Sequence, residues 1–157
     1  MKHIPLTKGF STIVDDKDYE WLSGHKWHVE GQSHYAARRT YNKDGSSKML
    51  YMHREIMKTK RGMDVDHING DPRDNRRSNL RNCSRRENML NKIGKKNGTS
   101  KYKGVSWNKL ALKWQVYISL KGKNKFLGCY EDQETGAKAY DKAAKKNYRE
   151  YAKLNFV

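Results

Sequence analysis

The chain of 157 residues lacks the features that define several classes of protein. Its two cysteines, Cys83 and Cys129, are far apart and belong to no CxxC or Cys/His cluster. This argues against a disulfide scaffold and against a structural zinc site. No segment approaches the roughly 18 apolar residues of a membrane span, and the first residues lack the apolar core of a signal peptide. We therefore expect reduced thiols, a cytoplasmic protein and no membrane partner.

Acidic residues are also scarce. The chain has 34 Lys and Arg against 17 Asp and Glu, a net charge of +17, and only 35% apolar residues. The excess is uneven: residues 1–52 carry 8 basic and 6 acidic groups, residues 53–97 carry 13 and 6, and residues 98–157 carry 13 and 5. A basic chain of this kind predicts a polyanionic partner, with nucleic acid as the leading candidate.

Residues 1–52 predict a β-rich N-terminal lead-in, with a hairpin turn at Asp44-Gly45. Asp18 is expected to cap a short helix. A second short helix is expected over residues 53–61. His53, at its start, has two interpretations: a site residue near a scissile phosphate, or a structural histidine packed on the hairpin.

The stretch from Met63 to Gly94 contains the largest concentration of candidate catalytic and metal-binding side chains. Alternating apolar residues predict a strand ending at Asp66-His67, then a long polar loop and a returning strand. Ser84-Arg85-Arg86-Glu87 is a capping box that predicts a helix to about Ile93. One acid, one imidazole and several amides thus lie among arginines. This set suits a hard metal ion held against a phosphate beside an activated water.

Residues 94–100 have the composition of a basic, flexible linker. In residues 101–157, apolar positions of period two indicate strands, and a helix is expected over about 133–148 with Asp132 as its N-cap. A three-stranded antiparallel sheet packed on one helix would leave its other face open to DNA. The predicted fold class is α+β throughout.

Residues 53–93 resemble the HNH (ββα-metal) homing endonucleases of phages and mobile introns. The resemblance rests on these motifs: His53-Arg54, Asp66-His67, Asp74-Asn75, Asn79-Leu80-Arg81 and Glu87-Asn88. Residues 101–156 resemble the plant ERF/APETALA DNA-binding domain. The matching runs are Tyr102-Lys103-Gly104-Val105, Lys113-Trp114, Phe126-Leu127-Gly128, the Ala139-Tyr140-Asp141 segment and the ending Ala152–Phe156.

The HNH resemblance implies roles for individual residues. Asp66 would be a metal ligand, His67 the general base, and Asn79 the residue that orients the imidazole of His67. Asn88 would be the second ligand, with Asn91 as its rival. Since Asn88 stands where the family name has histidine, we expect Mg²⁺, or Mn²⁺, rather than a softer metal. Five arginines are expected to contact phosphates: Arg76, Arg77, Arg81, Arg85 and Arg86.

The ERF/APETALA resemblance implies base contacts from the free sheet face. By match to the family, the residues are Lys103, Ser106, Tyr117, Ser119, Lys125 and Phe126. Several family arginines are replaced here, so the plant sequence preference should not carry over. Trp107 could either stack on nucleic acid or pack within the domain.

Together these features predict a metal-dependent, site-specific endonuclease acting on double-stranded DNA, encoded by a phage and working in the host bacterial cytoplasm. A single HNH site faces one strand, so a monomer would nick and a dimer could cut both strands. One alternative is a non-catalytic DNA-binding regulator with a decayed HNH unit. Another is a structural nucleic-acid-binding protein that acts through charge alone, with weak selectivity and steep salt dependence.

Overall fold

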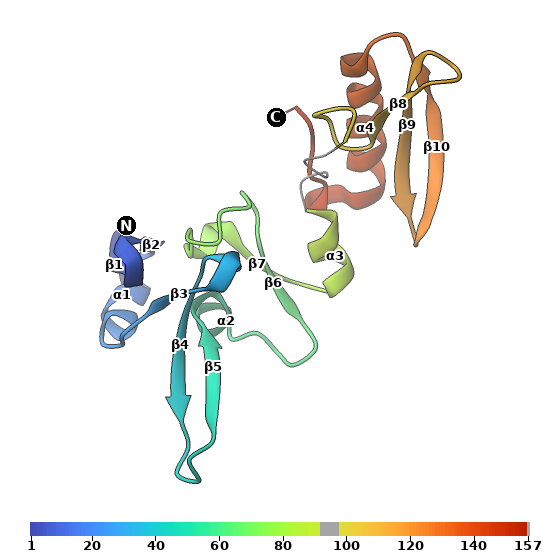
Figure 1. The fold of residues 1–157 in the computed structure, drawn as a ribbon. Helices are drawn as coiled ribbons and strands as arrows, with labels where there is room; N and C mark the ends of the chain where they lie inside the picture. The colour runs from blue at the N-terminus through green and yellow to red at the C-terminus, as the bar shows by residue number, and fades with distance from the viewer. Residues whose placement is uncertain (92–97, 157) are drawn as a thin grey trace. The chain divides into compact units, whose positions relative to one another are not determined.

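The computed structural model describes residues 1–91 and 98–156, and most of the linker predicted at 94–100 lies outside them. The chain is a mixture of small antiparallel sheets and short helices, so the α+β class is confirmed at this level (Figure 1). It divides into two compact units, Met1–Asn88 and Met89–Val157. None of the described helices combines the length and the apolar character needed to cross a membrane.

The first unit contains three small sheets and two helices, followed by the short helix α3 at the boundary between the units. The β1–β2 and β6–β7 pairs and the β3–β4–β5 sheet are all antiparallel. The elements in order are β1 Lys2–Pro5, β2 Ser11–Val14, α1 Asp16–Ser23, β3 His28–Glu30, β4 Tyr35–Tyr41, β5 Ser47–Tyr51, α2 Met52–Met57, β6 Asp64–His67, β7 Leu80–Cys83 and α3 Arg85–Leu90.

One apolar core runs through the first unit and joins the lead-in to the later segments. Its members come from β1, β2, α1, β3, β4, α2, β6 and β7. The buried residues are Ile4, Leu6, Val14, Leu22, Trp27, Val29, Ala36, Met52, Ile56, Val65 and Leu80. The β6–β7 ribbon is therefore anchored through Val65 and Leu80 to a body that residues 1–52 help to build.

Strand β2 also touches the loop after β6 through its backbone. Ile13 N donates to Arg73 O at 2.9 Å, and Asn75 N donates to Ile13 O at 2.8 Å. These two bonds bridge segments about 60 residues apart in sequence. They hold the polar loop, which carries much of the predicted chemistry, against the lead-in.

Two local expectations for helices in this unit are corrected by the structure. Helix α1 begins at Asp16 with Asp15 as the N-cap residue, and Asp18 lies inside it, bound to Arg77. Helix α2 ends at Met57 because Lys58 takes the left-handed conformation at φ 46°. Helix α3 runs over Arg85–Leu90, and its predicted end at about Ile93 lies outside the described residues.

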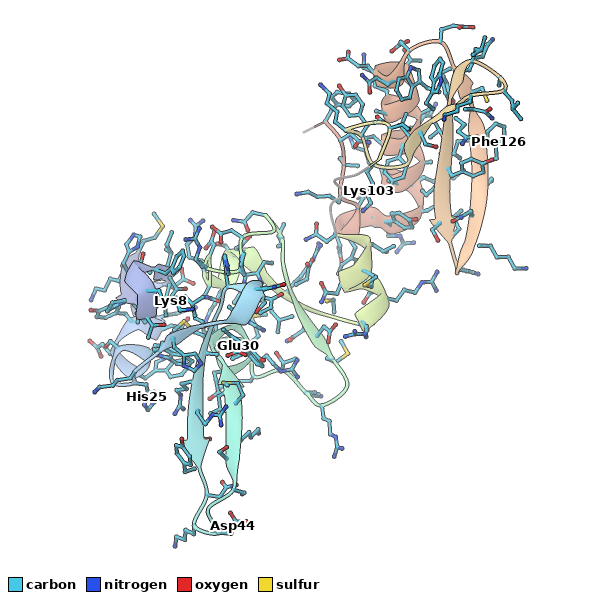
Figure 2. All side chains as sticks on the ribbon, in the orientation of Figure 1. Lys8, His25, Glu30, Asp44, Lys103 and Phe126 are labelled. Atoms are coloured by element: carbon cyan, nitrogen blue, oxygen red, sulfur yellow. The ribbon has the colours of Figure 1, made fainter. Side chains whose placement is uncertain are left out.

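Two other local predictions, a hairpin turn and a capping box, are confirmed. The hairpin turn at Asp44-Gly45 joins β4 and β5, and Asp44 lies at its tip (Figure 2). The capping box is formed: Ser84 N donates to Glu87 Oε2 at 2.7 Å and Glu87 N donates to Ser84 Oγ at 3.3 Å. This closes the turn that directs the chain from β7 into α3.

The second unit is a three-stranded antiparallel sheet, in the order β10–β9–β8, with helix α4 covering one face (Figure 1). Asp132 caps this helix by accepting from Thr135 N at 2.8 Å, as predicted. The apolar core of the second unit consists of Val105, Val116, Ile118, Ala137, Tyr140, Ala144 and Tyr148. The elements are β8 Val105–Asn108, β9 Lys113–Leu120, β10 Lys123–Tyr130 and α4 Gln133–Tyr148.

The position after Lys103 requires a glycine, Gly104, because the backbone packs closely there. Its φ is +82°, and a Cβ there would lie 2.1 Å from the ring of Tyr140. Only glycine satisfies both demands, so the loop can press against α4. Trp107 packs within the unit, with its ring centroid 5.1 Å from that of Trp114.

Candidate functional site

His67, at the end of β6, is enclosed by other rings. It is 6% exposed, and its ring lies 5.7 Å from Tyr35 in a stacked arrangement and 5.2 Å from His53 edge-on. Burial lowers the pKa of His67, although the hydrogen bond to Asn75 and the nearby carboxylate of Asp66 oppose the shift. The imidazole is therefore neutral at pH 7, as a general base must be.

A chain of hydrogen bonds fixes which nitrogen of His67 carries its proton. Thr12 Oγ1 donates to Arg73 O at 2.7 Å, so its oxygen accepts from Asn75 Nδ2, also at 2.7 Å. The other end of that amide, Asn75 Oδ1, then faces His67 Nε2 at 3.3 Å. Because a carbonyl oxygen only accepts, Nε2 is the protonated nitrogen and Nδ1 is the basic one. Thr12 and Asn75 are both 0% exposed, which holds the relay in place.

Asn79 does not take the place in this relay that the resemblance implied. Its Nδ2 donates to Asp74 O at 2.8 Å and to Asn69 Oδ1 at 3.0 Å, while its Oδ1 accepts from Asn69 N at 3.0 Å. The reason is its position: Leu80 stands opposite His67 in the β6–β7 register, and Asn79 lies just before it, facing the loop. Asn79 thus shapes the loop that carries Asn75.

Asp66 is paired with an arginine from the neighbouring strand. The two residues are directly opposite in the β6–β7 register, and Arg81 Nη2 lies 2.6 Å from Asp66 Oδ2, with Nε at 2.9 Å. Asp66 is 4% exposed. The guanidinium thus compensates the charge of the buried carboxylate and fixes its position.

Asn88, on α3, is brought to Asp64 at the start of β6. Asn88 Nδ2 donates to Asp64 Oδ2 at 3.1 Å. Because alternate residues of a strand share a face, Asp64 and Asp66 lie on the same side of the ribbon, roughly 7 Å apart. Asn91 belongs to the second unit.

A cleft of about 390 Å³ opens beside these groups. Asp64 and Asn88 line it, whereas His67 lies behind the rings of Tyr35 and His53. The complete lining is Ser33, Tyr35, Tyr51, His53, Arg54, Asp64, Val65, Arg85 and Asn88.

The donor set fits a hard divalent cation better than a zinc ion. Among residues 1–91 and 98–156, no group of three or more His, Cys, Asp and Glu side chains is arranged to hold a metal. The candidate oxygen ligands are those of Asn88, which contacts Asp64, and of Asp66, which follows Asp64 on the same face of β6. Mg²⁺ keeps several waters and takes only one or two protein oxygens, so such a sparse all-oxygen set suits it.

His53 is placed in the aromatic cluster, with the ring of Tyr35 at 4.8 Å and that of Tyr51 at 5.7 Å. It is 7% exposed, and burial lowers its pKa to about 3. Its Nδ1 has no hydrogen-bond partner among the described residues. The structure thus combines the two interpretations: a neutral, packed histidine that also lines the cleft.

The arginines of the predicted phosphate clamp divide into two groups. Arg76, Arg77 and Arg81 are held by the carboxylates of Asp74, Asp18 and Asp66, in that order. Arg85 and Arg86 are exposed, and the 3.9 Å contact of Arg85 with Asp64 leaves its side chain 86% exposed. The first group fixes loop and ribbon geometry, and the second is open to a phosphate.

In the second unit the predicted base-contacting residues also divide. Lys103 is half-buried, its Nζ donates to Leu90 O at 2.5 Å, and burial lowers its pKa to about 8. Ser106 Oγ accepts from Gln115 Nε2 at 3.2 Å. The remaining four are exposed on β9 and β10: Tyr117, Ser119, Lys125 and Phe126.

The exposed aromatic pair marks the open face of the sheet. The rings of Tyr117 and Phe126 lie 5.2 Å apart, and Phe126 projects from β10 on the side away from α4 (Figure 2). Phe126 is 52% exposed, which is unusual for a large apolar side chain on a sheet. Such a face suits a partner that offers bases for stacking.

The residues missed by sequence reasoning are those that position others. Asn75 was part of the Asp74-Asn75 motif but received no role. Thr12 and Asp64 carried no signal, since a threonine in a strand and an acid two residues before Asp66 are ordinary. Their contacts depend on folding: Thr12 and Asn75 are 63 positions apart.

Comparison with known proteins supports part of this picture. Residues 51–90 match a family described as HNH endonuclease. Over 63 residues the chain is 36% identical to Protein 3.8 of Escherichia phage T7, covering 40% of this chain and 52% of that protein. The chain thus spans about half the length of this curated relative.

Residues 51–90 therefore form a segment similar to HNH endonuclease domains, which suggests a nuclease-type, DNA-binding function for this segment. The phage relative agrees with a protein encoded by a bacteriophage. HNH nucleases generally use a divalent metal ion. The family match does not extend into residues 101–157, so the ERF/APETALA resemblance stays a prediction.

Proposed function

We propose that the protein is a metal-dependent, site-specific DNA endonuclease of the phage HNH homing type, with a ββα-metal unit formed by β6, β7 and α3. The observation that carries the proposal lies within the matched residues. His67 follows Asp66 directly, is neutral, and has its Nε2 held by Asn75, so that Nδ1 is the basic nitrogen. A buried histidine held in one tautomer is what activation of a water requires.

In the proposed reaction the water oxygen bonds to phosphorus, its proton passes to His67 Nδ1, and the bond to the leaving deoxyribose oxygen breaks. Asn75 keeps the ring in place and in the required tautomer throughout. Asn79 acts one step further out, by holding the loop that carries Asn75. Transfer of a proton to a positioned base typically accelerates a reaction by about 10²- to 10⁴-fold.

Asp66 and Asn88 are the proposed protein ligands for Mg²⁺ or Mn²⁺. When bound, the cation would neutralise charge that develops on the phosphate and on the leaving oxygen. The guanidinium of Arg81 holds the Asp66 carboxylate in position. Arg85 and Arg86 are exposed and would contact the flanking phosphates.

The second unit is the proposed recognition module, of ERF/APETALA type. The open face of the β8–β10 sheet would enter the major groove, where a narrow sheet can reach base edges. Tyr117 and Phe126 would contact bases, while Lys125 would contact phosphate. Ser119 and Ser106 lie on the same face, and Lys103 would instead stabilise the domain through Leu90 O.

The proposed setting is the host bacterial cytoplasm, with double-stranded DNA as the partner. With one HNH site per chain, a monomer would nick one strand, and a dimer could cut both.

The test is nicking of supercoiled plasmids that carry a library of random inserts, with sequencing of the nick positions. Wild-type protein should nick with Mg²⁺ or Mn²⁺, at a restricted set of sequences, and not in EDTA. His67→Ala should lose about 10²- to 10⁴-fold in rate. His25→Ala, at an exposed histidine of the same unit, is the matched control. Wild-type protein that binds a preferred sequence without nicking it would contradict the enzyme proposal.

One observation favours the alternative, a non-catalytic DNA-binding regulator with a decayed HNH unit. His67 is 6% exposed, and Asp66 is engaged by Arg81. A regulator predicts that binding to a preferred sequence is independent of metal and that neither wild type nor His67→Ala nicks any insert. Any metal-dependent nicking that disappears in His67→Ala decides against it.

A further inference from the structure

Asp64 contacts the proposed metal ligand Asn88, although nothing in the sequence indicated a role for Asp64. Its carboxylate Oδ2 accepts from Asn88 Nδ2 at 3.1 Å, and both residues line the cleft. The Asp64 side chain is 26% exposed, so it is sheltered but not removed from water. It stands two residues before Asp66 on β6 and therefore shares its face.

The chemistry of the two groups dictates how the amide is turned. An ionised carboxylate has acceptors only, so it can hold an amide only through the NH₂ group. Since Oδ1 and Nδ2 are at opposite ends of the amide, this contact turns Asn88 Oδ1 away from Asp64. An amide ligates a hard cation only through its oxygen. Without a partner, an asparagine could present either end.

We propose that Asp64 is a positioning residue that holds Asn88 so that its oxygen faces a divalent cation shared with Asp66. This inference rests on the proposed function, because it assumes that Asn88 is a ligand. Partners of this kind fix the orientation of metal ligands, and their loss typically weakens metal affinity by about 10- to 100-fold.

Arg85 is the other group that faces Asp64, and it does not compete strongly. Its Nη1 lies 3.9 Å from Asp64 Oδ2, and its side chain is 86% exposed. An exposed ion pair at this distance is weak because water screens it. The hydrogen bond to Asn88 is the shorter contact of this carboxylate, so Asp64 acts mainly on the amide.

A carboxylate near a cation also attracts it by charge, so the test must separate charge from orientation. The double variant Asp64→Asn/Asn88→Asp separates the two effects. It keeps the total charge of the pair and reverses the direction of the hydrogen bond. The amide at position 64 then donates to the carboxylate at position 88, whose other oxygen remains directed at the cation. Asp64→Asn alone loses both the charge and the fixed orientation.

The experiment measures Mn²⁺ binding to the full chain without DNA, by electron paramagnetic resonance, alongside plasmid nicking. We expect Asp64→Asn to weaken Mn²⁺ binding by about tenfold or more. The exchanged double variant should recover most of that loss. Glu20→Gln, which removes one exposed carboxylate from α1, should bind Mn²⁺ like wild type.

Several results would overturn the inference. Mn²⁺ binding by Asp64→Asn equal to wild type is one, and no binding of Mn²⁺ by wild type is another. If the double variant binds Mn²⁺ as weakly as Asp64→Asn while its circular dichroism is native, the carboxylate at position 64 acts by charge and not by orientation.

His67→Ala separates this inference from the proposed function: it should bind Mn²⁺ normally and fail to nick. Loss of nicking in every protein, with Mn²⁺ binding still dependent on Asp64, would sink the proposed function and leave this inference standing.

Discussion

The charged side chains of the two units are used in opposite ways. In the first unit Arg76, Arg77 and Arg81 are each held by a carboxylate, and all three of these carboxylates are almost fully buried. In the second unit, Lys125 and Phe126 are both exposed on strand β10, where they project to opposite faces of the sheet. Positive charge thus serves two purposes in the two units.

This difference teaches that net charge alone does not locate a DNA-binding surface. An arginine already bonded to a buried carboxylate has its donors engaged and fixes geometry, which suits a site that must hold a base and metal ligands within tight limits. An exposed lysine keeps its donors for a phosphate and gives binding that falls with salt. The predictions below test whether the first unit positions and the second unit binds.

The largest effect is expected when the relay behind His67 is broken at Thr12. Thr12→Val removes the acceptor for Asn75 Nδ2 and the donor to Arg73 O. The amide can then turn over and present Nδ2 to His67, which selects the tautomer with Nδ1 protonated. We expect nicking to fall by about 10- to 100-fold. Thr12→Ser, which keeps the hydroxyl, should stay near wild type, and ¹⁵N NMR of the imidazole should report the tautomer directly. An unchanged tautomer in Thr12→Val would contradict the relay.

The next effect concerns stability. Arg77 Nε and Nη2 donate to the two oxygens of Asp18 at 2.7 and 2.8 Å, and Asp18 is 3% exposed. Arg77→Ala leaves that carboxylate buried without its cation, so we expect about 2 kcal/mol less stability in urea unfolding, discounted because Arg77 itself is partly exposed. Lys125→Ala should change stability little, which is the matched comparison from the other unit. Equal effects would erase the difference between the units.

Order along the chain was predictable because its signals are local. The Ser84–Glu87 capping box, the Asp132 cap and the alternation through Trp114, Val116 and Ile118 each act within a few residues. They identify elements whatever the tertiary structure. The Asp66-His67 pair was found in the same way, from a motif of adjacent letters.

Partners distant in sequence were not predictable from these patterns. The Arg77–Asp18 pair joins residues 59 positions apart, and the Asn75–Thr12 bond joins residues 63 apart. Both form because β2 lies against the loop after β6, an arrangement set by the shared core. The expected N-cap role of Asp18 was wrong for this reason: its carboxylate binds an arginine from a distant loop.

A pH-dependent prediction follows from His53. Burial lowers its pKa to about 3, against an ordinary value of 6.5, so the folded protein leaves it neutral where the unfolded chain binds a proton. Between these values the unfolded state binds one more proton, so stability falls by about 1.4 kcal/mol for each pH unit of acidification. His53→Phe should remove this contribution, measured as a flatter dependence of unfolding free energy between about pH 6 and pH 5. An unchanged slope would mean that His53 titrates normally in the folded protein. His25→Phe, at an exposed histidine, is the control.

The smallest effect is expected on strand β10 of the second unit, and it bears most directly on the comparison between the units. Lys125→Ala removes one phosphate contact from an exposed position, so affinity should fall about fivefold and the slope of log affinity against log salt should fall by roughly one unit. Phe126→Ala should weaken binding by a similar amount with the salt slope unchanged, because the ring contacts bases and releases no counterion. Lys8→Ala, in the first unit, is a control of the same charge (Figure 2). Fluorescence anisotropy with a preferred duplex measures all three. If Lys125→Ala and Lys8→Ala weaken binding equally, strand β10 has no special part in recognition, and the chain binds DNA through diffuse charge.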